Sequence, residues 1–169
     1  MMKTDYEDTG LAQLFGMPFV VLRKPVPFDT TTLNFNWQVW DTKAFSLYSR
    51  STEKIDKKGA DMAIAAVCRF LSRMNVLNYN VYGGYESTVL LEEELVSLRS
   101  TASGLYIPHV KSFDSVERGQ ILADIIDPLT GVTVAQTEAP EDGIVFFAKD
   151  SPLVMENETL FKIVNKLHK

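Results

Sequence analysis

Apolar residues in the first 77 positions form short continuous runs and one helical repeat. Leu11, Leu14 and Phe15 are followed by Gly16, which is typical of a helix that ends at a glycine in the left-handed conformation. The run at 17–22 (MPFVVL) is short, continuous and close to a proline, and therefore predicts a buried strand. A second run at 44–48 (AFSLY) predicts a neighbouring strand.

The clearest helix is expected after Asp56, a residue type that suits the N-cap. Apolar residues recur there at helical spacing, which predicts one buried face: Ala63, Val67, Phe70, Leu71 and Met74. Asp61, Arg69 and Arg73 fall on the other side. Cys68 lies beside the apolar stripe with no histidine near it in sequence, so it is interpreted as a small core residue rather than a nucleophile.

The C-terminal half contains an internal repeat. Two sets of residues follow one another in the same order: Gly104, Val116, Gly119, Leu122 and Ile125, then Gly143, Val154, Asn157, Leu160 and Ile163. Asn157 stands where the first copy has Gly119, and asparagine tolerates a left-handed turn. The repeat predicts two similar units around a pseudo-twofold axis in a small flattened barrel. The expected core consists of Val116, Ile121, Ile125, Val145, Phe147, Leu160 and Ile163.

The turn-rich segment 78–84 (NYNVYGG) separates the two patterns. It predicts two domains, residues 1–82 with mixed helix and strand signals and residues 83–169 with short strands.

The overall composition is that of an ordinary globular protein. The 169 residues are 46% hydrophobic and 23% charged, with 17 basic and 22 acidic side chains and a net charge of −5. No Lys/Arg cluster stands out, so no nucleic-acid partner is expected. The longest apolar run, 62–68, is far shorter than the roughly 20 residues that span a bilayer, and the N-terminus has no signal-peptide pattern. We expect no membrane contact and a cytoplasmic location.

The second half contains a series of segments that follow one another in the order found in a known type of β module. These segments are SGLYIP at 103–108, VERGQILADI at 116–125, DPLTG at 127–131, APEDGIV at 139–145, then PLV and LFKI. They resemble the barrel-sandwich module of biotinyl and lipoyl carrier domains. More closely, they resemble the C-terminal module of the succinylglutamate desuccinylase/aspartoacylase family, in the zinc carboxypeptidase-like superfamily. The segments MPFVV, TTLNFNW and AFSLYSRSTEKID of the first half are similar to the last third of that family's catalytic domain. The fold class that this resemblance implies is α/β: a partial carboxypeptidase-like mixed sheet with a helix, followed by an all-β barrel-sandwich hybrid module.

A carrier function would need a lysine at the tip of the hairpin between the two repeat copies. That hairpin, 127–131, has none, and Lys111 and Lys149 lie at other turns. We therefore expect no biotin or lipoyl attachment.

Enzymes of the resembled family hold one Zn²⁺ through an H-x-x-E pair and a distant histidine, and the metal activates water to cleave an amide. His109 is followed three residues later by Ser112, and His168 is the penultimate residue, so neither fits. The resemblance implies the C-terminal part of a zinc-dependent deacylase or metallopeptidase-like hydrolase of N-acyl amino acids or similar small substrates. Zinc belongs to the full-length family, and none is expected on this chain alone, a fragment that should be inactive without the N-terminal metal-binding part.

The family's general-base position falls on Tyr48, and the nearest carboxylate is Glu53; both are candidate catalytic residues. A tyrosine is a poor base at neutral pH but can donate a hydrogen bond to an oxyanion. The alternative is that Tyr48 packs in the core and Glu53 caps the loop. Arg50 is a candidate for binding a substrate carboxylate or else a solvated charge. Trp37 and Trp40 either wall a substrate pocket or, more in keeping with tryptophan, supply packing area.

A second hypothesis is a non-catalytic binding or assembly module built on the barrel-sandwich domain. An upstream reading frame with H-x-x-E would favour the hydrolase, and its absence would favour the module. The expected partners of the hydrolase are a small N-acyl amino acid substrate and either a second copy or a separate N-terminal half, because the strands of the first domain lack neighbours.

Overall fold

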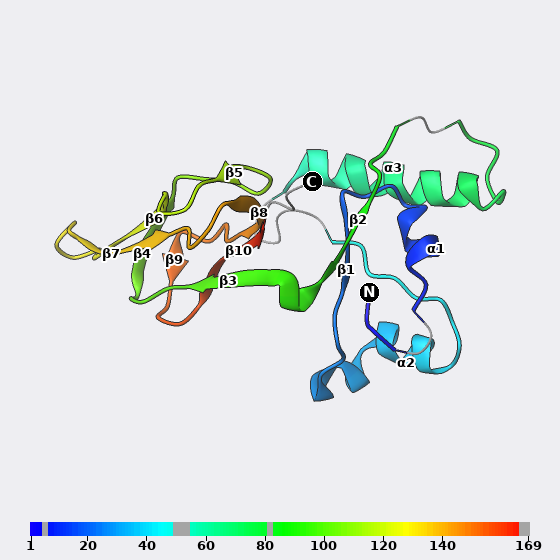
Figure 1. The fold of residues 1–169 in the computed structure, drawn as a ribbon, viewed down its shortest axis with the longest axis horizontal. Coiled ribbons are helices and arrows are strands. Elements are labelled where there is room, and N and C mark those ends of the chain that lie inside the picture. Colours follow the sequence, from blue (N-terminus) through cyan, green and yellow to red (C-terminus); the bar gives the residue numbers. More distant parts are fainter. Residues whose placement is uncertain (5–6, 49–54, 81–82, 166–169) are drawn as a thin grey trace. The chain divides into compact units, whose positions relative to one another are not determined.

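The computed structural model describes residues 1–4, 7–48, 55–80 and 83–165 (Figure 1). These residues form two compact units: unit 1 ends at Glu93 and unit 2 begins at Glu94. The predicted domains 1–82 and 83–169 would divide the chain earlier, before β2 (Thr88–Leu91), which pairs with a strand of unit 1. Whether either unit folds independently stays a prediction.

Unit 1 combines short helices with one parallel strand pair. Its elements in chain order are α1 (Thr9–Gln13), β1 (Phe19–Leu22), the 3-10 helix η1 (Pro27–Thr31), α2 (Leu33–Val39), α3 (Lys57–Arg73) and β2; the 3-10 turn η2 (Glu92–Glu94) lies at the boundary of the units. β1 and β2 pair in parallel from Phe19 opposite Thr88 to Leu22 opposite Leu91. The mixed α/β class predicted for this part is confirmed. No helix among the described residues is long and apolar enough to cross a membrane.

The predicted ends of the first and third helices are confirmed. Gly16 follows α1 with φ +62°, the left-handed conformation that glycine adopts without a Cβ clash. Asp56 caps α3: its carboxylate accepts a hydrogen bond from the Gly59 N–H at 3.0 Å.

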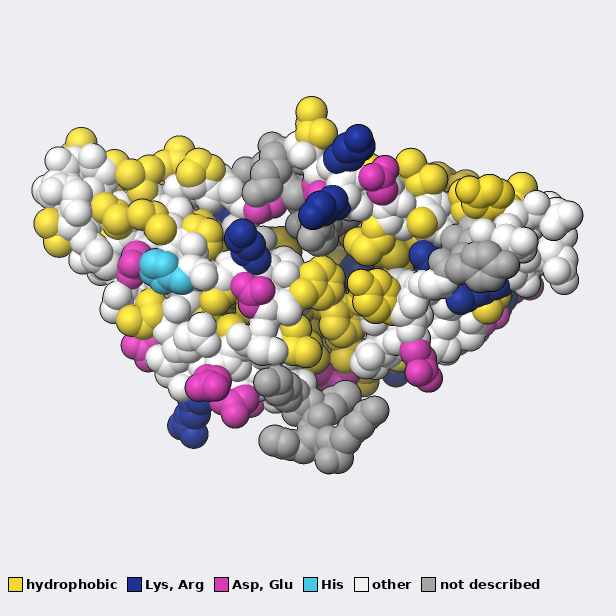
Figure 2. Space-filling view, turned by 90° about the horizontal axis from the view of Figure 1, so that it is seen from above, with side chains coloured by type: hydrophobic (Ala, Val, Ile, Leu, Met, Phe, Trp, Pro, Cys, Tyr) yellow, Lys and Arg dark blue, Asp and Glu magenta, His cyan; other side chains and the backbone are white. Residues whose placement is uncertain are grey.

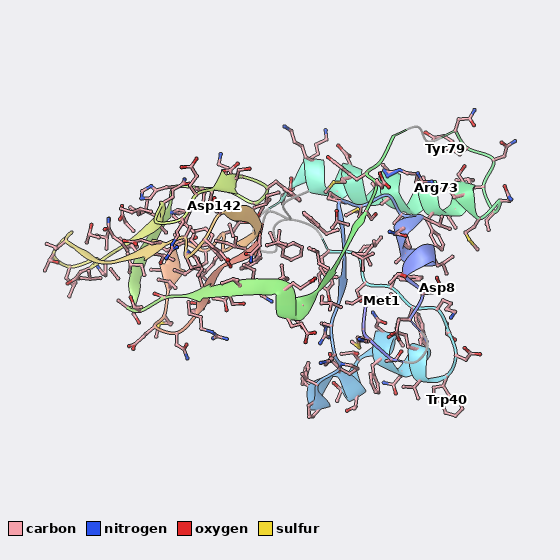
Figure 3. The ribbon with its side chains drawn as sticks, viewed as in Figure 1. Met1, Asp8, Trp40, Arg73, Tyr79 and Asp142 are labelled. Carbon is pink, nitrogen blue, oxygen red and sulfur yellow. The ribbon has the colours of Figure 1, made fainter. Side chains whose placement is uncertain are left out.

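The predicted buried face of α3 is partly wrong. Ala66 and Arg69 are buried, whereas Val67 and Met74 are 41% and 43% exposed. Small residues let the helix approach the rest of unit 1, and the long stem of Arg69 packs there while its guanidinium donates to the Phe15 carbonyl at 3.1 Å. Figure 3 shows Arg73, one turn later, beside α1, where it donates to the Leu14 carbonyl.

The predicted strand at 44–48 is wrong, because these residues have no regular secondary structure. Their apolar character serves packing instead. Ala44 is buried, and the Phe45 ring lies 5.6 Å from that of Phe15, which stacks on Phe70 of α3 at 4.2 Å. The segment thus contributes to the aromatic core of unit 1 without pairing in a sheet.

Unit 2 consists of two four-stranded sheets around one core. Its strands are β3 (Leu95–Arg99), β4 (Gly104–Pro108), β5 (Ser115–Val116), β6 (Ile121–Ile126), β7 (Thr133–Glu138), β8 (Gly143–Ala148), β9 (Leu153–Val154) and β10 (Thr159–Asn165). The sheet orders are β3-β10-β8-β5 and β7-β6-β4-β9. Both sheets contribute side chains to a single buried cluster. The all-β module predicted here is confirmed.

The internal repeat is visible in matching positions. Gly119 and Asn157 have φ of +79° and +67°, as the substitution of asparagine for glycine predicted. Leu122, Ile125 and their counterparts Leu160 and Ile163 are fully buried. The hydrogen bonds match too, since the N–H of residue 119 donates to the Ala139 carbonyl and that of residue 157 to the Ser100 carbonyl, each at 2.8 Å.

Two predicted core residues are wrong: Ile121 and Phe147 are 39% and 38% exposed. Register shifts occur beside both, between 121 and 123 in the pairing of β6 with β7, and between 162 and 163 in the pairing of β10 with β8. A β-bulge interrupts the two-residue alternation of faces. Leu122 and Phe161 fill the core instead.

Candidate functional site

Of the three predicted site residues, the structure describes one. Tyr48 is 76% exposed, so the alternative that it packs in the core is wrong. Glu53 and Arg50 lie outside the described residues, as does His168, and their proposed roles stay predictions.

A charged pair lies directly after β1 in unit 1. Both guanidinium nitrogens of Arg23 donate to the carboxylate of Asp29 in η1, one of them at 2.7 Å. Asp29 also accepts from the Val26 N–H at 2.8 Å, and its side chain is only 4% exposed. Such bidentate contacts are geometrically specific. The pair therefore holds Arg23 in a fixed direction at the end of the strand.

The interaction between Arg23 and Asp29 shifts the pKa values of both side chains. The hydrogen bond from Arg23 is the main cause that lowers the pKa of Asp29 below its ordinary value. The pKa of Arg23 is raised, mainly by the hydrogen bond to Asp29, with smaller contributions from the charges of Glu92 and Tyr48. Tyr48 and Glu92 thus belong to the surroundings of the Arg23 side chain.

A pocket of about 290 Å³ lies at the carboxyl ends of β1 and β2, lined by Lys3, Leu22, Arg23, Lys24, Val26, Leu91, Glu92 and Glu93. Ligands of open α/β sheets bind outside the carboxyl ends of parallel strands. The lining carries three cationic and two acidic side chains, and Lys24 lies 3.4 Å from Glu93. Two of the three cations are therefore already paired with carboxylates, Arg23 with Asp29 and Lys24 with Glu93.

The predicted aromatic wall is not part of this pocket. Trp40 is 82% exposed, so the expectation that it mainly supplies packing area is wrong, whereas Trp37 is half-buried. Figure 3 shows Trp40 at the outer end of α2. Neither residue lines the pocket.

The described residues do not fit a catalytic zinc site. Nowhere in 1–4, 7–48, 55–80 or 83–165 do three histidine, cysteine or carboxylate side chains converge as metal ligands. His109 follows β4 in unit 2 and pairs through Nε2 with Asp124 at 2.9 Å, as expected for a partly exposed residue of the β module. Asp124 in turn accepts from Gln136 at 2.8 Å.

The hairpin on which a carrier domain would need its lysine lies between β6 and β7. Its turn is closed by the Gly131 N–H, which donates to the Asp127 carbonyl at 2.8 Å, and Leu129 at its tip is 93% exposed. No lysine stands on this turn. Lys149 instead pairs with Glu158 at 2.5 Å.

Sequence reasoning missed Arg23 and Asp29. A local signal exists, because Pro27 at the start of a helix followed by an acid at its third position is typical of a capped N-terminus. That signal predicts the turn, but it does not show that Arg23 reaches across six residues to the same carboxylate.

No family model matches the sequence, and no curated protein matches it. Solved structures do. A succinylglutamate desuccinylase/aspartoacylase from Rhodobacter sphaeroides matches 100% of this chain and 53% of its own, at 15% identity and a TM-score of 0.76. The product-bound ectoine utilization protein EutE (DoeB) from Ruegeria pomeroyi covers 92% of this chain and 47% of its own, at 12% identity and a TM-score of 0.72.

An aspartoacylase family protein from Mesorhizobium loti covers 95% of this chain and 48% of its own, at 18% identity and a TM-score of 0.66. The chain thus spans about half the length of the structures it matches. The predicted resemblance is confirmed at the level of fold: from end to end, this chain has the fold of the corresponding part of succinylglutamate desuccinylase/aspartoacylase family proteins.

Proposed function

We propose that this chain is the C-terminal part of a zinc-dependent hydrolase that cleaves the amide bond of N-acyl amino acids or similar small substrates. The fold match over nearly the whole chain carries the proposal. Because this half has no converging metal ligands among its described residues, the metal-binding part has to be supplied by other polypeptide, and the chain alone is inactive.

The pocket at the ends of β1 and β2 would hold the substrate. Lys3 and Lys24 of its lining would attract a substrate carboxylate, which would replace Glu93 as the partner of Lys24, while Arg23 stays paired with Asp29. Tyr48, which is exposed, would donate a hydrogen bond to the carbonyl oxygen as negative charge develops. Glu53 and Arg50 remain candidates for proton transfer and for carboxylate binding. In this proposal the zinc ligands belong to other polypeptide, so the residues of this chain bind and orient the substrate but do not hold the metal.

The partner of the chain in this proposal is the metal-bearing part, which would add strands to the two-stranded sheet of unit 1. A parallel pair is normally part of a larger sheet covered on both faces. Among the described strands, β2 pairs with β1 alone. Unit 1 could instead associate with a second copy of itself through its exposed apolar side chains.

The test starts from the coding sequence upstream of Met1. We expect an H-x-x-E motif there, and the complete protein with zinc should release amino acids from a panel of N-acyl amino acids. Tyr48→Phe should lower kcat roughly 100-fold, as loss of one oxyanion donor does. The matched control Tyr79→Phe, at another exposed tyrosine, should not. Absence of both the motif and hydrolysis would support the non-catalytic module instead.

A further inference from the structure

Arg69 of α3 is a buried cation with very few partners. Its residue is only 6% exposed, and among the described residues its guanidinium forms a hydrogen bond with the Phe15 carbonyl oxygen alone, from Nη1 at 3.1 Å. The buried Nε has no partner there, and none of the described carboxylates forms an ion pair with the side chain. A buried charge without a counter-charge is costly in free energy, because water no longer solvates it. The position of Arg69 therefore favours an anion nearby.

Two glycines make room for this side chain. A Cβ added at Gly16 would lie 3.1 Å from Cδ of Arg69, and a Cβ added at Gly84 would lie 2.9 Å from Nε. Both glycines have positive φ, +62° and +107°, a conformation that glycine adopts without a steric penalty. Nε thus lies against the backbone of Gly84, a residue that has no side chain to separate the charge from its surroundings.

A second pocket of unit 1, of about 390 Å³, lies at this glycine. It is lined by Gln13, Arg73, Gly84, Tyr85, Glu86 and Ser87. Arg73 follows Arg69 by one turn of α3, and its Nη1 donates to the Leu14 carbonyl at 2.9 Å. The Tyr85 N–H donates to the Gly16 carbonyl at 2.9 Å. These contacts hold the lining in place on the C-terminal end of α1.

The charge at this pocket is positive and local. Arg73 stands in the lining and Arg69 lies behind Gly84, whereas Glu86 is the one acid among the lining residues and forms no ion pair with Arg73 among the described residues. The face shown in Figure 2 carries basic and acidic side chains interspersed rather than a broad basic surface. Attraction of an anion to this pocket therefore depends on these two arginines.

We propose that this pocket, which we call the Gly84 pocket, binds a small oxyanion, the carboxylate or phosphate group of a small molecule. Arg73 binds the oxyanion through guanidinium nitrogens other than the one that holds Leu14. The bound charge lies over Gly84 and neutralises Arg69 across a short layer of protein, where charges interact more strongly than in water. Tyr85, which is 60% exposed, packs against the remainder of the ligand. The Gly84 pocket is separate from the pocket at the ends of β1 and β2, and this proposal does not depend on the hydrolase function.

Titration of the full chain with inorganic phosphate at constant ionic strength tests the proposal by NMR. The backbone amides of Gly84 and Tyr85 and the Nε–H of Arg69 should shift along a saturable curve, with a Kd in the millimolar range or below. Arg73→Gln should weaken binding at least about tenfold, as expected for the loss of a charged hydrogen bond. Glu86→Gln should tighten binding, because it removes the negative charge of the lining. A parallel titration with acetate identifies which oxyanion the pocket prefers.

The matched control is Lys24→Gln in the other pocket, which should leave the shifts at the Gly84 pocket unchanged. Circular dichroism melts verify the folding of each variant, and Glu86→Gln, at an exposed position, decides the matter if Arg73→Gln unfolds. Shifts that do not saturate with either anion, or that are equal in the wild type and the folded variants, would overturn the proposal. Loss of binding in Lys24→Gln but not in Arg73→Gln would also overturn it, because the anion would then occupy the pocket at the ends of β1 and β2.

Discussion

Asp29 lies at the centre of the charged groups that follow β1, and its contacts predict a pH-dependent contribution to stability. Its carboxylate accepts from Arg23 and from the Val26 N–H, and its pKa is lowered, chiefly by the hydrogen bond from Arg23. A lowered pKa in the fold means stabilisation that is present above the ordinary value near 4 and is lost as the pH falls toward the lowered pKa.

Asp29→Asn should therefore lower the melting temperature at pH 7 and have a much smaller effect near pH 3. The helical circular dichroism signal measures this in unit 1, which holds α1, α2 and α3. An equal loss at both pH values would show that the charge of Asp29 contributes nothing and that only its shape matters.

Tyr106 is a buried tyrosine in the core of unit 2 whose hydroxyl has no hydrogen-bond partner among the described residues. Burial, with a smaller contribution from Asp150, raises its pKa well above the ordinary value. The neutral form is favoured in the fold, so stability is present below pH 10 and is lost as the pH rises toward the raised pKa.

Tyr106→Phe should leave stability at pH 7 unchanged or raise it by up to about 1 kcal/mol, because it removes a polar atom without a partner. At pH 11 the variant should be clearly more stable than the wild type. Thermal melts at both pH values check this. A melting temperature several degrees lower at pH 7 would mean that the hydroxyl has a partner, such as a bound water.

Among the elements, Gly143 at the start of β8 shows that close packing can require a glycine where the backbone conformation does not. Its φ is not positive, unlike that of Gly119. What requires glycine here is space: a Cβ would lie 2.5 Å from Cγ2 of Ile163 and 2.7 Å from the Val164 carbonyl oxygen.

Gly143→Val should cost about 3 kcal/mol, since overpacking displaces a neighbouring strand. The control is Gly119→Asn, where nothing lies within 4 Å of an added Cβ and where the equivalent Asn157 already has positive φ. It should cost less than about 1 kcal/mol. Urea unfolding of the full chain measures both. Equal costs at the two sites would contradict the close-approach explanation.

The elements that the sequence predicts well are those that local residues determine. The Asp56 cap and the Gly16 stop define helix ends within one turn. The repeat can be read because Val116 and Val154, like Leu122 and Leu160, occupy equivalent buried positions. Features that depend on residues far apart in the sequence could not be predicted from local patterns. The run 44–48 has strand composition but forms no strand, and bulges lie beside Ile121 and Phe147, which are exposed instead of buried.

Most of the candidate site also depends on residues that are distant in the sequence. Tyr48 was identified through the resemblance, but the Arg23 and Asp29 pair depends on a turn that brings two residues together, and the pocket depends on β2, almost 70 residues from β1. The sequence pattern does not predict that β1 pairs with β2. The charged residues around Arg23 could therefore be identified only from the structure.

For the whole molecule, we predict that the chain does not hold a zinc ion stoichiometrically. His109 pairs with Asp124, and among the described residues no third histidine, cysteine or carboxylate side chain joins them as a metal ligand; two ligands hold zinc weakly compared with three or four. After dialysis, the chain should retain well under one zinc per molecule, and His109→Ala should not change that amount. Stoichiometric zinc that is lost in His109→Ala would contradict this and would place a metal site in unit 2.

The two units should also differ in their ability to fold alone. Unit 2 has its own core, with Leu122, Ile125, Phe161 and Ile163 fully buried between two four-stranded sheets. In the part of unit 1 that the structure describes, β1 and β2 are the only paired strands, and a two-stranded sheet is marginal without further cover. A fragment of residues 94–165 should therefore melt cooperatively, because a closed core of this size is marginally sufficient. A fragment of residues 1–93 should bind an apolar dye and associate or aggregate. If instead 1–93 melts cooperatively as a dye-free monomer, unit 1 is stable without additional strands, which would contradict the proposal that a metal-bearing part adds strands to its sheet.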